Sequence, residues 1–276
     1  RCHPDGHGAV TTPREDVLRE LELLPVWRQR ESTKAQAEAP ASVPQVQVAE
    51  QVISHYADTD LPPLSTTLAQ GRADAIKQMD WQSLQDCVAN CEACVLSKTR
   101  TQTVFGVGDP HAEWLLVGEA PGAEEDRKGE PFVGQAGKLL DNMLAAIALK
   151  RGQNVFIANV LKCRPPANRD PQGEEVTQCD PFLKRQVELI KPKLIIAVGK
   201  FAAQSLLNTT STIGSLRGKL HDYHGVPVIV TYHPAYLLRT LSDKAKAWED
   251  LCFARSSMQA LQSVAKPQSS KLLSPE

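Results

Sequence analysis

The sequence predicts an α/β fold, a three-layer α/β/α sandwich around a four-stranded, mainly parallel sheet. Four short runs rich in Val, Ile and Leu are almost continuously apolar, at residues 113–120, 154–163, 192–199 and 226–234. This pattern is typical of strands that are buried on both faces. Segments with helical spacing separate the runs, and strands that alternate with helices form a parallel sheet covered on both sides.

The helices of the sandwich are predicted from the spacing of apolar residues. The clearest lies at 136–148, where apolar side chains recur at i, i+3, i+4 and i+7. Residues 173–191 and 200–208 can supply further helices, and residues 242–264 close the domain with another. We therefore expect one domain over residues 81–264 and a disordered tail at 265–276.

Residues 1–80 are expected to form an extension outside this domain. A short amphipathic helix is predicted at 12–24, because Thr12 suits the N-cap, Pro13 suits the first helical position and Glu15 completes a capping box. The stretch that follows is rich in Ala, Pro, Gln and Glu and is typical of a flexible linker. Two interpretations stay open: a poorly ordered tail without a function, and a tethered helix that docks on a protein partner.

Composition and charge narrow the class of protein. None of the 276 residues belongs to an apolar run of the roughly 18 residues that a membrane span needs. The N-terminus lacks the layout of a secretory signal, and we expect a cytoplasmic monomer. Residues 91–262 carry 21 Lys/Arg against 18 Asp/Glu, so this part is the better candidate for binding a polyanion.

Polar side chains stand at the ends of the four apolar runs. Glu119 ends the first, Asn159 lies in the second, Lys200 follows the third and His233 follows the fourth. Open parallel sheets bind ligands at the carboxyl ends of their strands. A carboxylate, an amide and an imidazole should therefore meet at one edge of the sheet.

The turn after the first run has the outline of a phosphate-binding loop but the wrong charges. It reads GEAPGAEED, with Pro and Gly between an apolar run and a helix-like segment. Its acids are Glu119, Glu124, Glu125 and Asp126, and it has no lysine. Phosphate loops carry a lysine and backbone donors instead, so a phosphate ligand is disfavoured.

The cysteines predict a metal centre. Cys91 and Cys94 have the C-x2-C spacing that lets two thiolates face one metal, and Cys163 and Cys179 bracket a proline-rich loop after the second run. Four thiolates suit either tetrahedral zinc or an iron–sulfur cluster, and the spacing does not choose between them. Cys87 could replace one of the four. The loop itself, with Lys162, Arg164 and Arg169, is expected to present a rigid basic surface to a phosphate backbone.

Four stretches carry a resemblance to a known family. GEAPGAEED, PFVGQAG, NVLKCRPPANRDP and HPAYLLR, in this order and with the four cysteines, resemble the iron–sulfur uracil-DNA glycosylases, family 4 of the uracil-DNA glycosylase superfamily. The resemblance covers about residues 85–255. It implies a base excision repair enzyme that flips uracil out of double- or single-stranded DNA and hydrolyses its N-glycosidic bond, leaving an abasic site. It further implies that Cys91, Cys94, Cys163 and Cys179 hold a [4Fe–4S] cluster, with Cys87 a bystander.

The resemblance also implies roles for the polar edge. Glu119 matches the acid of the catalytic region, His233 the histidine that faces uracil O2, Asn159 the asparagine that reads the base edge, and Phe132 the ring on which uracil stacks. Donors aimed at O2 suit the reaction because the departing base becomes an anion. The turn residues Ala120, Pro121 and Gly122 would form one wall of the base pocket.

The general base stays open. Ala120 stands where family 1 enzymes carry a water-activating aspartate, and family 4 itself has a small residue there. Glu119 is the first candidate and Glu125 the second.

Several residues near His233 and in the loops could contact DNA. Leu237 and Leu238 could wedge into the stack that the base vacates, although the other interpretation is the buried face of the last helix. Lys200, Arg239 and Arg164 could contact phosphates. The rival functions are an iron–sulfur protein that binds nucleotides or transfers electrons, and a catalytically inactive DNA-binding relative.

Overall fold

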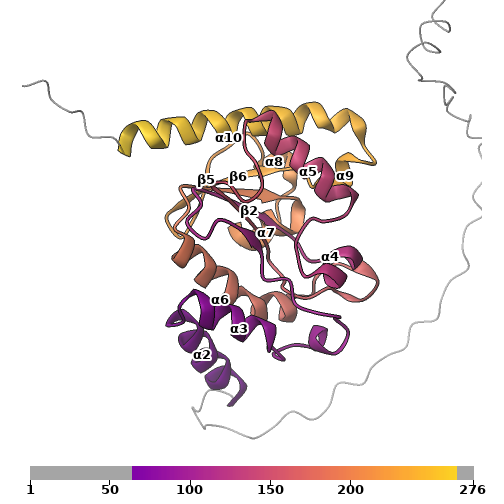
Figure 1. Cartoon of the computed structure of the whole chain (residues 1–276), viewed down its shortest axis with the longest axis vertical. Coiled ribbons are helices and arrows are strands. Elements are labelled where there is room, and N and C mark those ends of the chain that lie inside the picture. Colours follow the sequence, from indigo (N-terminus) through magenta and orange to yellow (C-terminus); the bar gives the residue numbers. More distant parts are fainter. Residues whose placement is uncertain (1–63, 266–276) are drawn as a thin grey trace, which may run out of the picture. The chain divides into compact units, whose positions relative to one another are not determined.

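The four apolar runs form the parallel centre of one sheet in the computed structural model, which describes residues 64–265 (Figure 1). The runs become β2 (Trp114–Gly118), β3 (Val155–Asn159), β4 (Leu194–Val198) and β6 (Val226–Thr231). Strand β2 pairs in parallel with β3 and β4, and β4 pairs in parallel with β6. Every residue of β2, β3 and β4 is buried, as strands covered on both faces must be.

The predicted number of strands is wrong, because the sheet has six. Its order is β1-β3-β2-β4-β6-β5, with β1 (Val107–Gly108) and β5 (His221–Tyr223) added antiparallel at the two edges. These edge strands are two and three residues long and contain no apolar run. Edge strands need little burial, so hydropathy gave no signal for them.

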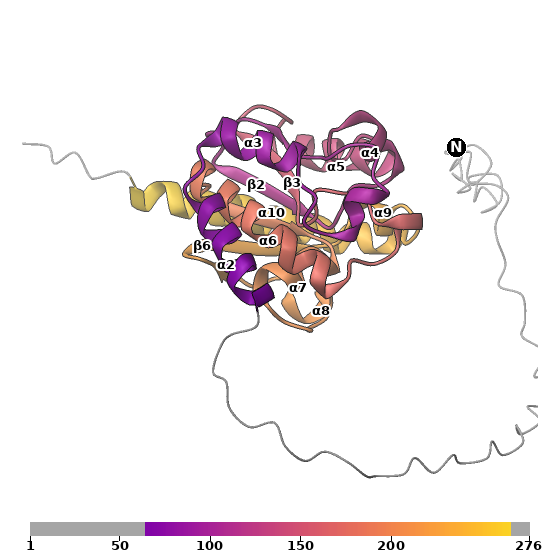
Figure 2. The ribbon, with the colours of Figure 1, turned by 90° about the horizontal axis from the view of Figure 1, so that it is seen from below.

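Helices cover both faces of the sheet, which confirms the sandwich. Figure 1 shows α5 and α10 along one side and α2, α3 and α6 along the other, and Figure 2 shows α2, α3 and α6 lying across the strands. Alternate residues of β2 serve the two cores: Leu115 and Val117 pack in the core that contains Phe182 of α6, and Leu116 in the core that contains Leu140 of α5. The helical elements are α2 (Leu64–Lys77), α3 (Trp81–Ala89), η1 (Val95–Lys98), α4 (Ala123–Lys128), α5 (Gln135–Ala146), η2 (Pro166–Asn168), α6 (Gly173–Ile190), α7 (Lys200–Leu207), α8 (Ile213–Leu216), α9 (Pro234–Leu237), η3 (Leu241–Asp243) and α10 (Lys244–Ala265).

The four predicted helices of the domain are confirmed as α5, α6, α7 and α10, each within a few residues of the expected bounds. None of the helices between residues 64 and 265 is both long enough and apolar enough to cross a membrane.

The predicted domain boundary at residue 81 is corrected by α2. Ile76 is buried in the core, and Arg72 Nη1 donates to the backbone carbonyl of Gln178 in α6 at 2.9 Å. Few large apolar residues mark α2 in the sequence, so tertiary contacts rather than an amphipathic stripe hold it. The predicted helix at 12–24, the linker after it and the tail from residue 266 lie outside the described residues.

Candidate functional site

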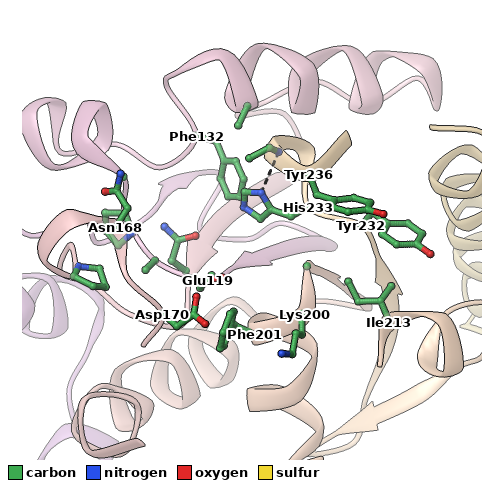
Figure 3. A pocket seen from close by; sticks show the side chains of 18 of the residues that line it. Glu119, Phe132, Asn168, Asp170, Lys200, Phe201, Ile213, Tyr232, His233 and Tyr236 are labelled. Atoms are coloured by element: carbon green, nitrogen blue, oxygen red, sulfur yellow. Dashed lines mark hydrogen bonds between the residues drawn. The ribbon is translucent and has the colours of Figure 1, made fainter. Parts of the chain in front are cut away.

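A cleft of about 800 Å³ lies at the carboxyl edge of the parallel strands (Figure 3). Its walls come from the ends of these strands and the loops that follow them, as open α/β sheets place their ligands. The structure brings together at this cleft Glu119, Ala120, Pro121, Gly122, Glu125, Phe132, Asn159, Lys200, His233 and Arg239.

Glu119 is a half-buried carboxylate at the end of β2. Burial raises the pKa of Glu119 to about 7, the negative charge of Asp170 adds to the rise, and Lys200 partly offsets it. Figure 3 shows these three side chains on one side of the cleft. A carboxyl group with a pKa near neutrality can exchange its proton during a reaction at ordinary pH.

Glu125 has a different environment, because backbone donors occupy its carboxylate. Oε2 accepts from the backbone N–H of Gly122 at 3.1 Å, and Oε1 accepts from Val133 at 2.9 Å and Gly134 at 3.2 Å. This carboxylate ties the turn after β2 to the loop that precedes α5. It also sits where a phosphate loop would hold a phosphate, which weighs against the nucleotide-binding alternative.

Phe132 presents a ring to the cleft from a left-handed backbone. Its φ is +55°, a conformation that residues with a Cβ seldom adopt. The ring is buried and stacks on the His233 imidazole, with centroids 5.5 Å apart and an interplanar angle of 30°. A Cβ at Gly118 would lie 2.6 Å from the Phe132 ring and 2.4 Å from Asn159 Oδ1, so only glycine leaves room for both.

Asn159 ends β3 with a buried polar side chain. The residue is 2% exposed, and Oδ1 has no hydrogen-bond partner among the described residues. Buried polar groups in proteins nearly always have a partner. Since Asn159 lines the cleft, this oxygen is a candidate acceptor for a ligand's donor.

His233 follows β6 and is held in one tautomer. The backbone N–H of Ala235 donates to Nδ1 at 3.1 Å, so in the neutral ring the proton is on Nε2. Burial lowers the pKa of His233 to about 4, with a further lowering by Arg239 and a partial offset by Glu125. The ring is therefore a neutral donor at physiological pH.

The structure separates the two candidate wedge residues. Leu237 is 1% exposed in the core formed with α5 and α10, which agrees with the other interpretation, the buried face of a helix. Leu238 is 43% exposed and directly precedes Arg239, which lines the cleft. Lys200 and Arg239 line the cleft, whereas Arg164 lies outside it and donates to Asn168 Oδ1 at 2.7 Å.

The predicted basic surface of the loop after β3 is also corrected. Lys162 is 1% exposed, and its Nζ donates to the carbonyl of Asn159 at 2.8 Å and to Gln186 Oε1 at 2.6 Å. Arg169 pairs with the buried carboxylate of Glu175 at 2.5 Å. A lysine with two internal acceptors braces the loop instead of facing solvent.

The four cysteines predicted as ligands line one small cavity. Cys91, Cys94, Cys163 and Cys179 do so together with Arg100, whereas Cys87 does not line it. Two of the sulfur atoms accept hydrogen bonds at 3.2 Å: Cys163 from Arg100 Nη1, and Cys179 from the backbone N–H of residue 162. N–H donors and the positive charge of a guanidinium stabilise the negative charge of thiolates. The surroundings of these sulfur atoms therefore fit a metal or cluster that is bound by thiolates.

Two thiolate-bound groups suit the chemistry of these four cysteines, tetrahedral zinc and an iron–sulfur cluster. Among residues 64–265, no group of three or more His, Cys, Asp or Glu side chains is placed to hold a metal ion.

Several residues of the cleft were not predicted as site residues. Asn168 and Asp170 belong to the quoted stretch NVLKCRPPANRDP, so the motif could have pointed to them. Tyr236 likewise belongs to the quoted stretch HPAYLLR. Phe201 and Tyr232 carry no such signal, since an aromatic residue beside a strand end is ordinary core.

Comparison with known proteins identifies the family of this chain. A sequence model described as "Uracil DNA glycosylase superfamily" matches residues 105–252. A type-4 uracil-DNA glycosylase of Archaeoglobus fulgidus is 51% identical over 168 residues, which is 57% of this chain and 84% of that protein. Type-4 enzymes of Sulfurisphaera tokodaii (44%, over 57% of this chain and 75% of the relative) and Pyrobaculum aerophilum (42%, over 63% and 92%) are also similar. The chain therefore belongs to the type-4 uracil-DNA glycosylases of the uracil DNA glycosylase superfamily.

Proposed function

We propose that this chain excises uracil from DNA by hydrolysing the bond between deoxyribose C1′ and uracil N1. One observation carries the proposal: the buried, unpartnered Asn159 Oδ1 shares a cleft with the His233 donor and the Phe132 ring. A flat ring beside an acceptor and a donor is complementary to a flipped pyrimidine base.

Asn159 would read the edge of the base. Its Oδ1 can accept from uracil N3–H while its Nδ2 donates to O4. Cytosine has an acceptor at N3 and a donor at C4, so it would leave polar groups unpaired on both sides. A buried site that loses its partners discriminates strongly, which explains how uracil is selected over cytosine.

His233 would stabilise the departing base. As the glycosidic bond breaks, negative charge develops on uracil, and the neutral Nε2–H can donate to O2. A fixed donor in a buried site needs no reorganisation when the charge develops. The Ala235 N–H supports this role, because it keeps the proton on Nε2.

Glu119 would act on the sugar side of the same bond. Its carboxylate favours the sugar cation and can hold the attacking water, as carboxylates do in glycoside hydrolysis. Glu125, with three backbone donors, is assigned to holding the two loops together.

We expect the excision rate to rise with pH through about 7, because the ionised form of Glu119 is the active one. His233, whose pKa is about 4, stays neutral over this range and does not contribute. Glu119→Gln should flatten the profile and lower the rate at pH 8 by about 100-fold. Single-turnover rates from about pH 5.5 to 9 measure this. A profile of unchanged shape in the variant would assign the titration to another group.

Stability should change in the opposite direction. The unfolded chain ionises Glu119 near its ordinary pKa of 4.5, whereas the folded protein holds the proton up to about 7. Stability is therefore lost as pH rises between these values. Glu119→Gln should raise the Tm at pH 8 while it lowers activity.

The four cysteines would hold a [4Fe–4S] cluster. When bound, the cluster supplies a cross-link of four thiolate bonds rather than a step of the hydrolysis. It would join the segment before η1, the loop after β3 and α6, and so stiffen the loop that carries Asn168 and Asp170 to the cleft.

Cys163→Ser should remove most of the protein-bound iron, which we expect at about four per chain, together with the visible absorption. Cys87→Ser is the matched control, since Cys87 lies outside the cavity. It should keep both. Colourless wild-type protein with one zinc per chain would disprove the cluster.

Duplex DNA would meet the chain at the mouth of the cleft. Lys200 and Arg239 line it and can contact phosphates, Arg164 lies on the adjacent loop, and the exposed Leu238 is the remaining wedge candidate. Such contacts predict salt-dependent binding with little sequence preference. A cytoplasmic location, a monomeric state and a partner for residues 12–24 stay predictions from the sequence.

The function is tested with an oligonucleotide that carries a single uracil. Cluster-loaded protein should release uracil from U·G duplex and from single strands, and alkali should then cleave the strand at that position. Oligonucleotides with thymine or cytosine in place of uracil should remain intact. DNA binding without release of uracil would support the inactive relative, and reversible redox activity without DNA binding would support the electron-transfer alternative.

A further inference from the structure

The peptide group between Phe132 and Val133 is held at both ends by charged side chains. Glu125 Oε1 accepts from the Val133 N–H at 2.9 Å, and Arg151 Nη2 donates to the Phe132 carbonyl at 2.9 Å. Rotation of this peptide group would break both hydrogen bonds together. The group directly follows the left-handed Phe132, so these bonds maintain a conformation that the residue disfavours by itself.

Arg151 uses three of its N–H groups for this purpose. Nη1 donates to the carbonyl of Pro131 at 2.9 Å, Nη2 to that of Phe132, and Nε to Asp141 Oδ1 at 2.9 Å. Asp141 lies on α5 and thus fixes the direction of the guanidinium. The planar fork of arginine matches two consecutive carbonyls, which a lysine ammonium cannot do.

The other side of the same carbonyl is closed by α5. A Cβ at Gly137 would lie 1.8 Å from the Phe132 oxygen, so the helix approaches the turn as closely as glycine allows. Arg151 itself does not line the cleft. Whatever it contributes to the reaction must therefore pass through the turn and the Phe132 ring.

We propose that Arg151 is a positioning residue for excision, because it holds the Phe132 ring in place before the base arrives. The inference rests on the proposed function, since it assigns a role to a residue that supports the base platform. A ring fixed beside His233 gives the flipped base a ready surface, whereas a mobile turn would have to be ordered at each binding event.

Arg151→Gln removes the charge and the fork and is the test variant. We expect its kcat/KM for uracil excision to fall about 10-fold or more, with unchanged affinity for uracil-free duplex, because the phosphate contacts lie elsewhere. Arg151→Lys should recover only part of the loss. Wild-type protein is assayed alongside, so that failure of the proposed function, meaning no excision by wild type, is distinguishable from failure of this inference.

Arg185→Gln is the matched control for a purely structural effect. Arg185 also donates to a backbone carbonyl, that of Met79 at 2.7 Å, and pairs with a carboxylate, Glu188, at 2.9 Å. The two arginine side chains are similarly covered, 22% exposed for Arg151 and 19% for Arg185. Arg185→Gln should lower the Tm as much as Arg151→Gln does and leave kcat/KM within about 2-fold.

A double-mutant cycle with Phe132→Ala identifies the route of the effect. If Arg151 acts through the ring, Arg151→Gln should change the activity of Phe132→Ala protein by less than about 2-fold. An additive loss in that background, or full activity of Arg151→Gln in the wild-type background, would overturn the proposal. Where the variant does not fold, as seen by circular dichroism, the same cycle is run with Asp141→Ala, which removes the acceptor of the Arg151 Nε–H and leaves the charge of Arg151 in place.

Discussion

His233→Ala should lower the rate of uracil excision by about 100- to 1,000-fold, the usual loss when one donor to a developing anion is removed. In the proposed mechanism uracil leaves as an anion, and the Nε2–H of His233 donates to O2. The pKa of about 4 means that the ring donates as a neutral imidazole, so the loss should be the same at pH 6 and pH 8 once the Glu119 titration is allowed for. Single-turnover rates on a U·G duplex measure it.

Two controls keep this result interpretable. His111→Ala removes an exposed histidine outside the cleft and should leave the rate unchanged. His233→Gln retains a side-chain N–H and should recover part of the loss. An alanine variant with more than half of the wild-type rate would remove His233 from the mechanism. A loss confined to pH values below 5 would instead overturn the role of the neutral ring, since only protonated His233 would then contribute.

Asn159→Ala should cause the second large effect, a fall in kcat/KM of about 30- to 1,000-fold. The variant leaves uracil N3–H and O4 without partners in a buried site, at a cost of roughly 2–4 kcal/mol for the two groups. The same measurement with Phe132→Leu, which keeps an apolar contact but loses the flat ring, should show a smaller loss.

The stability of Asn159→Ala separates recognition from folding. Oδ1 has no partner among the described residues, so its removal takes away a buried polar atom that gains nothing in the free protein. We expect the Tm to stay the same or rise. A clear fall in Tm together with the loss of activity would mean that the amide supports the end of β3 and not the base.

The central strands of the sheet could be predicted because a strand that is buried on both faces must consist almost entirely of apolar residues. β2, β3 and β4 are buried at every position, and such strands must be apolar throughout. The edge strands β1 and β5 and the helix α2 have no comparable apolar pattern in the sequence. They are held by hydrogen bonds and contacts with the rest of the chain. One example is the hydrogen bond from Arg72 of α2 to the carbonyl of Gln178 in α6.

The candidate site divides in a similar way. Strand ends of a parallel sheet converge by topology, so Glu119, Asn159 and His233 could be expected to meet. Which leucine is free could not be predicted, because Leu237 and Leu238 are adjacent and of the same type. Their exposures of 1% and 43% depend on how α9 packs against α5 and α10.

The sequence by itself determined the sandwich, the edge at which ligands bind, the four cysteines and the family. Only the tertiary structure decided the state of each polar group: the tautomer of His233, the occupied carboxylate of Glu125, the unpartnered oxygen of Asn159 and the internal role of Lys162. The reason is physical. Hydropathy patterns and motif spacing are properties of consecutive residues and can be read from the sequence. In contrast, pKa values and hydrogen bonds depend on atoms a few ångströms apart that come from distant parts of the chain.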